Sequence, residues 1–207
     1  MVAEVIGRPY DPPGAPFDPL VELAGMWTTD LAERYLPVPG VPPVKYECLD
    51  GNLIMSPYEA GPNGFAMLKL AMAMDGPAHE AGLAVYPTVN LRITSQRWIQ
   101  PDLTIVRNPN PDVWVDVDNV VLVGEFVSPS SVRRDRFDKP DLCAEAGIPY
   151  YLLGKADLRQ RFVSLRLSRL ELGEYKVIAE AVSGELFETD EPFPISLRPL
   201  DLLDIRR

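Results

Sequence analysis

The stretch Val120-Val121-Leu122-Val123-Gly124-Glu125-Phe126-Val127 places one acidic side chain in an apolar run. It is short and rich in β-branched residues, which predicts a buried β-strand. Because strand side chains alternate between two faces, the residues expected on the face of Glu125 are Val121, Val123 and Val127. An unpaired buried carboxylate costs several kcal/mol or becomes protonated. Glu125 therefore indicates a functional site, unless it lies on a solvated edge or pairs with an arginine.

A second carboxylate begins another apolar run, residues 102–106, directly after Pro101. If this run and the strand of Glu125 are neighbours, Asp102 and Glu125 can reach one ion. Hard cations such as Mg²⁺ are bound by one or two carboxylates together with waters and substrate phosphate oxygens. The two acids therefore predict a metal site, although an aspartate after a proline is also typical of a turn.

The segment that follows Glu125 departs from the charge of the rest of the chain. Residues 133–139 include four basic side chains, Arg133, Arg134, Arg136 and Lys139, and only two acidic ones. This patch is expected to contact phosphates of a nucleic acid, although a solvated charged loop has the same composition. A helix is expected over residues 133–146, ending at Gly147, or starting later with Asp138 as its cap and Pro140 in its first turn.

The remaining pattern alternates between helices and strands. Asp50-Gly51 between two apolar runs predicts a hairpin of residues 44–49 and 52–55. Further strands are expected over 83–89, 90–93, 150–153, 162–172 and 174–181, and the last two are expected to pair as a hairpin across Gly173. Helices are expected over 20–36 (or two short ones with a cap at Thr28 or Thr29) and 65–74. The last of these is apolar nearly all round, so we expect it against a sheet or a partner subunit, with an interruption or kink at Gly76-Pro77. The order predicts one α/β domain with a mixed sheet.

Residues 1–19 contain Pro9, Pro12, Pro13, Pro16 and Pro19 and predict an extended arm. The arm is expected either to be a loose tail or to pack on the domain or on a second subunit. Residues 20–207 are expected to form the single domain.

Charge limits the partners of this chain. Its 20 basic and 30 acidic residues give a net charge of −10, which excludes a general polyanion binder. Any contact with DNA must come from a local basic patch that works against the net field. No apolar run approaches the length of a membrane span, and the N-terminus lacks the apolar stretch of a signal peptide. We therefore expect a cytoplasmic protein without a membrane partner.

Histidine and cysteine are too rare for several kinds of site. With one histidine and two cysteines, the chain cannot build a zinc finger or zinc ribbon. His79 precedes Gly82 at an expected helix end, which favours a surface or capping role over a catalytic one. The chemistry must therefore come from carboxylates, lysine, arginine or hydroxyls, and Cys48 and Cys143 are expected to stay reduced.

Several motifs together carry a family resemblance. They are Tyr46-Glu47-Cys48-Leu49-Asp50-Gly51-Asn52-Leu53-Ile54-Met55-Ser56-Pro57, Gln100-Pro101-Asp102, Glu125-Phe126-Val127-Ser128-Pro129-Ser130-Ser131, the spacing from Asp135 to Lys139, and Ala146-Gly147-Ile148-Pro149-Tyr150-Tyr151-Leu152. In order and spacing, over roughly residues 28–181, the chain resembles the Uma-type putative restriction endonuclease family, a branch of the PD-(D/E)XK nuclease superfamily.

The resemblance implies a restriction-endonuclease-like fold, with a central mixed β-sheet flanked by helices, and often a homodimer. It implies a Mg²⁺ (or Mn²⁺) site with Asp102 and Glu125 as ligands. The superfamily's lysine, two residues after the glutamate, is replaced here by Val127, and Lys139 matches a lysine that takes its place from the following helix. Glu47 falls on a further acidic position that could approach the site.

Two departures from the family pattern stand out. The family usually carries a histidine early in the second helix, where this chain has Gly61-Pro62-Asn63-Gly64. Aromatic residues often found after the lysine are replaced by Cys143 and Leu152. An auxiliary role of that histidine is therefore lost, whereas the set Asp102, Glu125 and Lys139 is intact.

These observations leave three functional hypotheses. The first is a metal-dependent endonuclease that hydrolyses DNA phosphodiester bonds, with Lys139 beside the nucleophile and the arginines on flanking phosphates. The second is a catalytically silent binding or interaction protein on the nuclease scaffold, which the charge of −10 and the missing histidine favour. The third is a hydrolase of another small phosphate ester, with the same site.

Overall fold

The computed structural model describes residues 16–58, 61–127 and 138–203 of the chain. Its helices are α1 (Pro19–Glu22), α2 (Thr29–Tyr35), α3 (Gly61–Glu80) and α4 (Lys139–Glu145), with 3₁₀ turns η1 (Val117–Asn119) and η3 (Pro199–Leu202). Its strands are β1 (Val44–Leu49), β2 (Asn52–Pro57), β3 (Ala84–Pro87), β4 (Asn90–Thr94), β5 (Arg97–Ile99), β6 (Leu103–Val106), β7 (Trp114–Asp116), β8 (Val120–Phe126), β9 (Tyr150–Asp157), β10 (Phe162–Glu171), β11 (Glu174–Val182), β12 (Phe187–Thr189) and β13 (Ile195–Leu197).

Two larger sheets build the molecule. The six-stranded sheet has the order β11-β10-β9-β8-β6-β3, and the five-stranded sheet has the order β2-β1-β5-β4-β7. In the first, β8 pairs antiparallel with β6 and parallel with β9, so the sheet is mixed. A third, two-stranded sheet joins β12 and β13. The predicted α/β class with a mixed sheet flanked by helices is confirmed, and β1, β2, β4, β5 and β7 form a separate sheet beside it.

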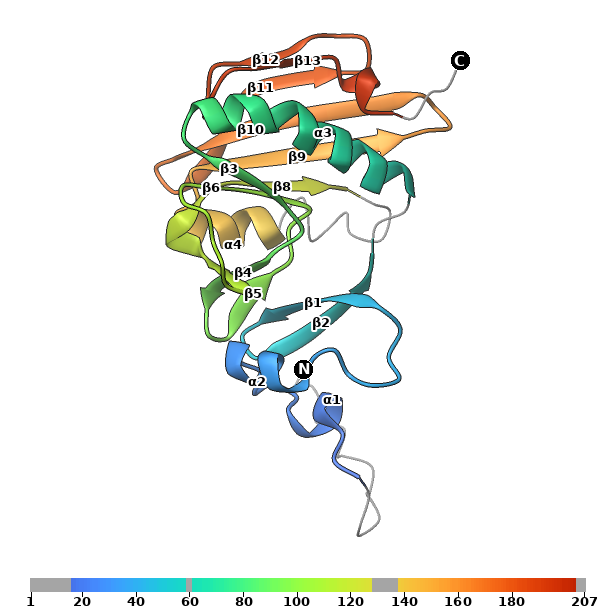
Figure 1. Ribbon diagram of the computed structural model, residues 1–207, viewed down its shortest axis with the longest axis vertical. Coiled ribbons are helices and arrows are strands. Elements are labelled where there is room, and N and C mark those ends of the chain that lie inside the picture. Colours follow the sequence, from blue (N-terminus) through green and yellow to red (C-terminus); the bar gives the residue numbers. More distant parts are fainter. Residues whose placement is uncertain (1–15, 59–60, 128–137, 204–207) are drawn as a thin grey trace, which may run out of the picture.

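Both faces of the six-stranded sheet are covered. Helix α3 crosses one face, and α4 lies between the other face and the five-stranded sheet (Figure 1). Helix α3 contributes its buried side chains at a spacing of four residues, Ala66, Leu70, Met74 and Ala78. On the other face, Leu142 and Cys143 of α4 pack with Leu91, Ile99 and Val115 of the five-stranded sheet. As a result, all seven residues of β8 are buried.

A β-bulge in β8 changes which residues share a face. Val106 of β6 pairs with Val120, but Ile105 pairs with Leu122, so Val121 is an extra residue in the ladder. Val121 packs in the cluster on the α3 face, whereas Val123 packs on the α4 face. The prediction that Val121 shares a face with Val123 and Glu125 is therefore wrong, because strict alternation holds only without a bulge.

Two predicted hairpins are confirmed. β1 and β2 are joined by Asp50 and Gly51, and β10 and β11 are joined by Leu172 and Gly173. In both turns the two central residues have positive φ, which is the type I′ geometry that matches the twist of the flanking strands. Gly51 is further constrained because a Cβ there would lie 2.5 Å from the carbonyl oxygen of Gly25.

The structure selects one of the predicted alternatives for residues 20–36 and for α4, and it shows no interruption of α3 at Pro77. Residues 20–36 form the two short helices α1 and α2, and the Thr28 side chain caps α2 by accepting from the Leu31 N–H at 3.3 Å. Pro77 lies inside α3 and does not interrupt it, because Met74 and Ala78 are buried on either side of it. Helix α4 has the later predicted start, with Asp138 at the N-cap and Pro140 in the first turn.

The N-terminal arm, except for residues 16–19, lies outside the described residues, and so do residues 204–207. Trp27, Ala32, Cys48, Trp98 and Trp114 form a third hydrophobic cluster, which lies between the five-stranded sheet and the α1–α2 region. Among the described residues, no helix has both the length and the apolar character to cross a membrane.

Gly154 in β9 tests the packing of the central sheet. A Cβ at this position would lie 2.7 Å from Cε1 of Phe126, the buried residue that it pairs with in β8. Gly154→Ala is therefore expected to lower the free energy of unfolding by about 1–3 kcal/mol, measured by urea denaturation. Gly184→Ala, where a Cβ meets nothing within 4 Å, should change it by less than about 0.5 kcal/mol. Equal effects of the two substitutions would contradict this packing.

Candidate active site

The carboxylates of Asp102 and Glu125 lie on one face of the six-stranded sheet. Leu103 pairs with Gly124, so the antiparallel register places Asp102 opposite Glu125, and directly opposite residues share a face. Both are buried, with exposed fractions of 1% and 2%. The Phe126 N–H donates to Asp102 Oδ2 at 2.8 Å, which fixes that carboxylate against β8.

Lys139 reaches the same place from the first residue of α4. Its Nζ lies 2.7 Å from Glu125 Oε1 and 2.9 Å from Glu47 Oε1. Glu47 belongs to β1 of the other sheet, so this one ammonium group joins the two sheets and the helix. The structure therefore brings together all four residues that the sequence proposed for the site: Asp102, Glu125, Lys139 and Glu47.

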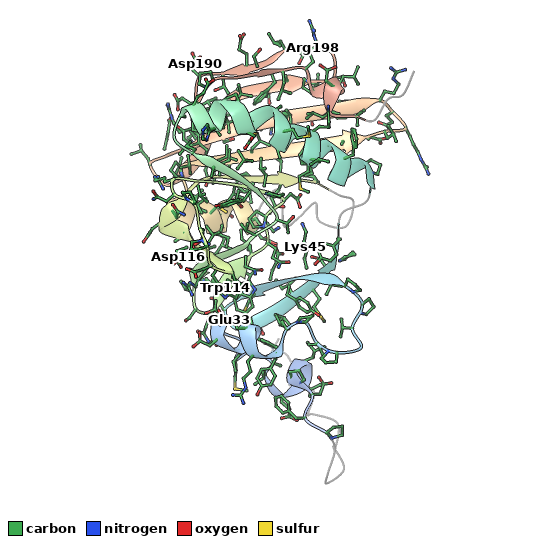
Figure 2. The ribbon with its side chains drawn as sticks, in the orientation of Figure 1. Glu33, Lys45, Trp114, Asp116, Asp190 and Arg198 are labelled. Carbon is green, nitrogen blue, oxygen red and sulfur yellow. The ribbon has the colours of Figure 1, made fainter. Side chains whose placement is uncertain are left out.

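A fifth charged side chain, which the sequence analysis did not single out, completes the group. Lys45 of β1 is buried, and its Nζ lies 2.5 Å from Asp102 Oδ1. In Figure 2, Lys45 lies at the side of β1 that faces the six-stranded sheet. We call Lys45, Glu47, Asp102, Glu125 and Lys139 the charged cluster. Lys45 could have been found from its position two residues before Glu47, which was already a candidate. Residues two apart in a strand share a face.

Gln100 positions Glu47 within the cluster. The Gln100 N–H donates to Glu47 Oε1 at 3.1 Å, and its side-chain Oε1 accepts from the Tyr46 N–H at 3.2 Å. The side-chain amide also donates to Asn90 Oδ1 at 2.6 Å. Gln100 therefore bridges to β1 directly after the end of β5, and its N–H fixes the Glu47 carboxylate that also contacts Lys139.

The cluster is nearly balanced in charge. Three carboxylates and two ammonium groups sum to −1 when all are ionised. Burial lowers the pKa of Lys45, but the neighbouring Asp102 and Glu125 carboxylates outweigh it, so its net pKa lies above the ordinary value. Burial also raises the pKa of Cys143, further assisted by Glu125, which keeps this thiol protonated and unsuited to act as a nucleophile.

The predicted phosphate contacts Arg133, Arg134 and Arg136 lie outside the described residues. His79 occupies the last turn of α3, as the sequence predicted.

Comparison with known proteins shows the family of this chain. A family model described as "Uma2: Putative restriction endonuclease" matches residues 32–203. The chain belongs to the Uma2 family. A search of curated proteins found no match.

One solved structure similar to this Uma2 member comes from Anabaena variabilis and is described as a "putative nuclease" of the DUF820 family. The two chains share 14% sequence identity and superpose with a TM-score of 0.58. The match covers 82% of this chain and 95% of the Anabaena chain. At this identity the likeness concerns the fold, and it supports the nuclease-type α/β architecture.

The carboxylates of Asp102 and Glu125 are the type of ligand that hard divalent cations prefer. Asp102 and Glu125 offer carboxylate oxygens on one buried face, and Mg²⁺ needs only one or two carboxylates when waters complete its shell. Within the described ranges, no three His, Cys, Asp or Glu side chains are placed to hold a metal ion together. With two carboxylates as its protein ligands, a cation here would keep several waters. The hydroxyl of Thr104, two residues from Asp102 in β6, is buried and has no hydrogen-bond partner among the described residues, so such a water could bond to it.

Removal of the Lys45 ammonium group tests the electrostatic balance. Lys45→Met leaves Asp102 buried with one cation fewer, so the free energy of unfolding at neutral pH is expected to fall by about 3–5 kcal/mol. The matched control is Lys176→Met, which removes an exposed ion pair with Glu174 and should have little effect. Urea denaturation of both variants measures the difference, and a Lys45→Met protein as stable as the wild type would contradict the proposed balance.

Proposed function

We propose that this Uma2 protein is a metal-dependent endonuclease that hydrolyses phosphodiester bonds of DNA. The observation that carries the proposal is the pair Asp102 and Glu125, opposite one another on adjacent strands, with Lys139 in contact with Glu125. Family membership supports the nuclease class. Metal dependence, DNA as substrate and the residue roles are inferred from the chemistry of these side chains.

Each member of the cluster has a distinct part in this proposal. Asp102 and Glu125 would hold the ion. When bound, such an ion polarises a phosphodiester oxygen and lowers the pKa of a coordinated water. Lys139 stabilises negative charge on the phosphate in the transition state. Glu47 accepts from Lys139 and keeps its Nζ beside Glu125, and Lys45 balances the charge of Asp102.

The charge arithmetic agrees with a phosphodiester substrate. A cluster of −1 becomes +1 with a divalent ion, and one phosphodiester carries −1, so the complete site would be neutral. The rest of the chain is strongly acidic, so DNA must be held locally. We propose that Arg133, Arg134 and Arg136 supply these contacts, with binding that weakens as salt is raised.

A catalytically silent scaffold is the competing function. The observation in its favour is that Lys45 and Lys139 already lie against Asp102 and Glu125, so the acids are neutralised by the chain itself. The two functions differ in whether a divalent ion can bind at these carboxylates and support turnover.

Substitution of the two carboxylates tests the proposed enzyme. In a plasmid-nicking assay with Mg²⁺ or Mn²⁺, Asp102→Asn and Glu125→Gln are each expected to lower the rate about a hundredfold or more, because several kcal/mol of transition-state stabilisation is lost. Glu180→Gln, which removes an exposed carboxylate paired with Arg166, should keep the wild-type rate. Activity that survives both cluster substitutions would overturn the mechanism, and a wild type without nicking activity would favour the silent scaffold.

Metal removal gives a second test. Treatment with EDTA is expected to abolish nicking, and Mg²⁺ or Mn²⁺ added in excess should restore it, since the proposed mechanism takes its Lewis acid from the ion alone. The measurement is the nicking rate before chelation, after chelation and after addition of each ion. Undiminished activity in EDTA would show that hydrolysis proceeds without the ion.

A further inference from the structure

A large aromatic pocket lies on the opposite face of the five-stranded sheet from the charged cluster. Tyr46 alternates with Lys45 and Glu47 along β1 and therefore points to the other side of the sheet. The pocket has a volume of about 1040 Å³, the upper end of the range typical of small-molecule sites. The side chains that define this aromatic pocket are Tyr46, Tyr58, Trp98, Trp114, Asn90 and Gln100.

The walls of the aromatic pocket combine prolines with packed and hydrogen-bonded aromatic rings. The segment between α2 and β1 contributes Pro37, Pro39, Pro42 and Pro43, which have fixed φ. The rings of Trp98 and Trp114 meet edge to face, with centroids 5.6 Å apart. The Trp98 indole donates to the Tyr46 carbonyl at 3.1 Å, and the Trp114 indole donates to Glu33 at 2.6 Å. Glu33 and Trp114 are labelled on adjacent elements in Figure 2. A pre-organised pocket of this kind loses little entropy when a ligand binds.

The polar groups of the pocket disfavour a phosphate and favour an uncharged ring. Arg92 is already paired with Asp116 through two bonds of 2.7 and 3.1 Å, and Glu33 and Asp112 also line the pocket. The side-chain amides of Asn90 and Gln100, which hydrogen-bond to each other, are neutral polar groups on its wall. Tyr58 is 56% exposed and offers a ring face at the rim.

A residue that lines this pocket carries an unsatisfied polar atom. The Tyr46 side chain is 8% exposed, and its hydroxyl is buried beneath the pocket surface with no hydrogen-bond partner among the residues described. A buried hydroxyl without a partner is unfavourable, because it has lost its hydrogen bonds to water. A ligand with a hydrogen-bonding edge would remove this cost, whereas a purely apolar ligand would not.

We propose that the aromatic pocket binds a nucleobase, a planar, uncharged ring with hydrogen-bonding edges that can stack on Tyr58 and pair with the Tyr46 hydroxyl. The base belongs either to a free nucleotide or to an unstacked position of a nucleic-acid strand. Gln100 connects this second site to the first, because its side chain lines the pocket while its N–H holds Glu47. The proposal does not depend on nuclease activity.

Binding is measured in EDTA, so that no cleavage occurs, by calorimetric titration with adenosine, AMP, ribose 5-phosphate and a short single-stranded oligodeoxynucleotide. Ligands with a base are expected to bind, and ribose 5-phosphate is expected not to bind. Binding of AMP or adenosine identifies a free nucleotide as a ligand, and binding of the oligonucleotide alone identifies a strand. Absence of binding by every base-containing ligand, or equal binding of ribose 5-phosphate, overturns the proposal.

Two variants tie the binding to this pocket. Tyr58→Ala should weaken it about fivefold or more, as expected for the loss of one stacking ring, whereas Phe17→Ala, which removes an exposed aromatic outside the pocket, should not. Tyr46→Phe should weaken binding while leaving the free energy of unfolding unchanged or higher, which a merely structural hydroxyl would not do. Wild-type affinity in both pocket variants contradicts the assignment, whatever the outcome of the nicking assay.

Discussion

Three carboxylates buried between two sheets cannot stay charged without cations beside them, and this requirement organises the centre of the molecule. Asp102 and Glu125 come from the six-stranded sheet, and Glu47 comes from the five-stranded sheet. Lys45 crosses from the five-stranded sheet to Asp102, and Lys139 joins Glu125 to Glu47 from α4. The contacts that neutralise the acids are therefore also contacts that hold the two sheets and the helix together.

The bulge at Val121 makes this arrangement possible. Val120 packs on the α4 face, so strict alternation would place Glu125, five residues later, on the α3 face among apolar side chains. The extra residue shifts the alternation of side chains by one position, so Val123 and Glu125 face α4 and β1. Bulges are frequent next to functional sites because they redirect a side chain without ending a strand. Here one inserted residue brings Glu125 opposite Asp102 on the inner face.

The sequence predicted which segments form helices and strands better than it predicted which face each strand residue occupies and which strands are neighbours. Asp50-Gly51 and the turn at Gly173 are local signals, and both hairpins formed as expected. The pairing of the Asp102 and Glu125 strands was only a condition in the sequence argument, because strand order depends on contacts distant in the chain. The bulge has no local signature, since Val121 suits either face. Pro77 favoured a break in α3, but the packing of residues on both sides of it prevailed.

The residues of the candidate site were likewise predicted only in part. Motif spacing identified Asp102, Glu125, Lys139 and Glu47, while Lys45 was missed because a lysine at the start of a strand is usually solvated. Its burial became evident only once β1 was seen to lie against the six-stranded sheet. The most direct measurement of the central claim is calorimetric titration of the metal-free protein with Mn²⁺. A single site that is lost in both Asp102→Asn and Glu125→Gln is predicted, and an absence of binding, or binding unchanged in both variants, would contradict it.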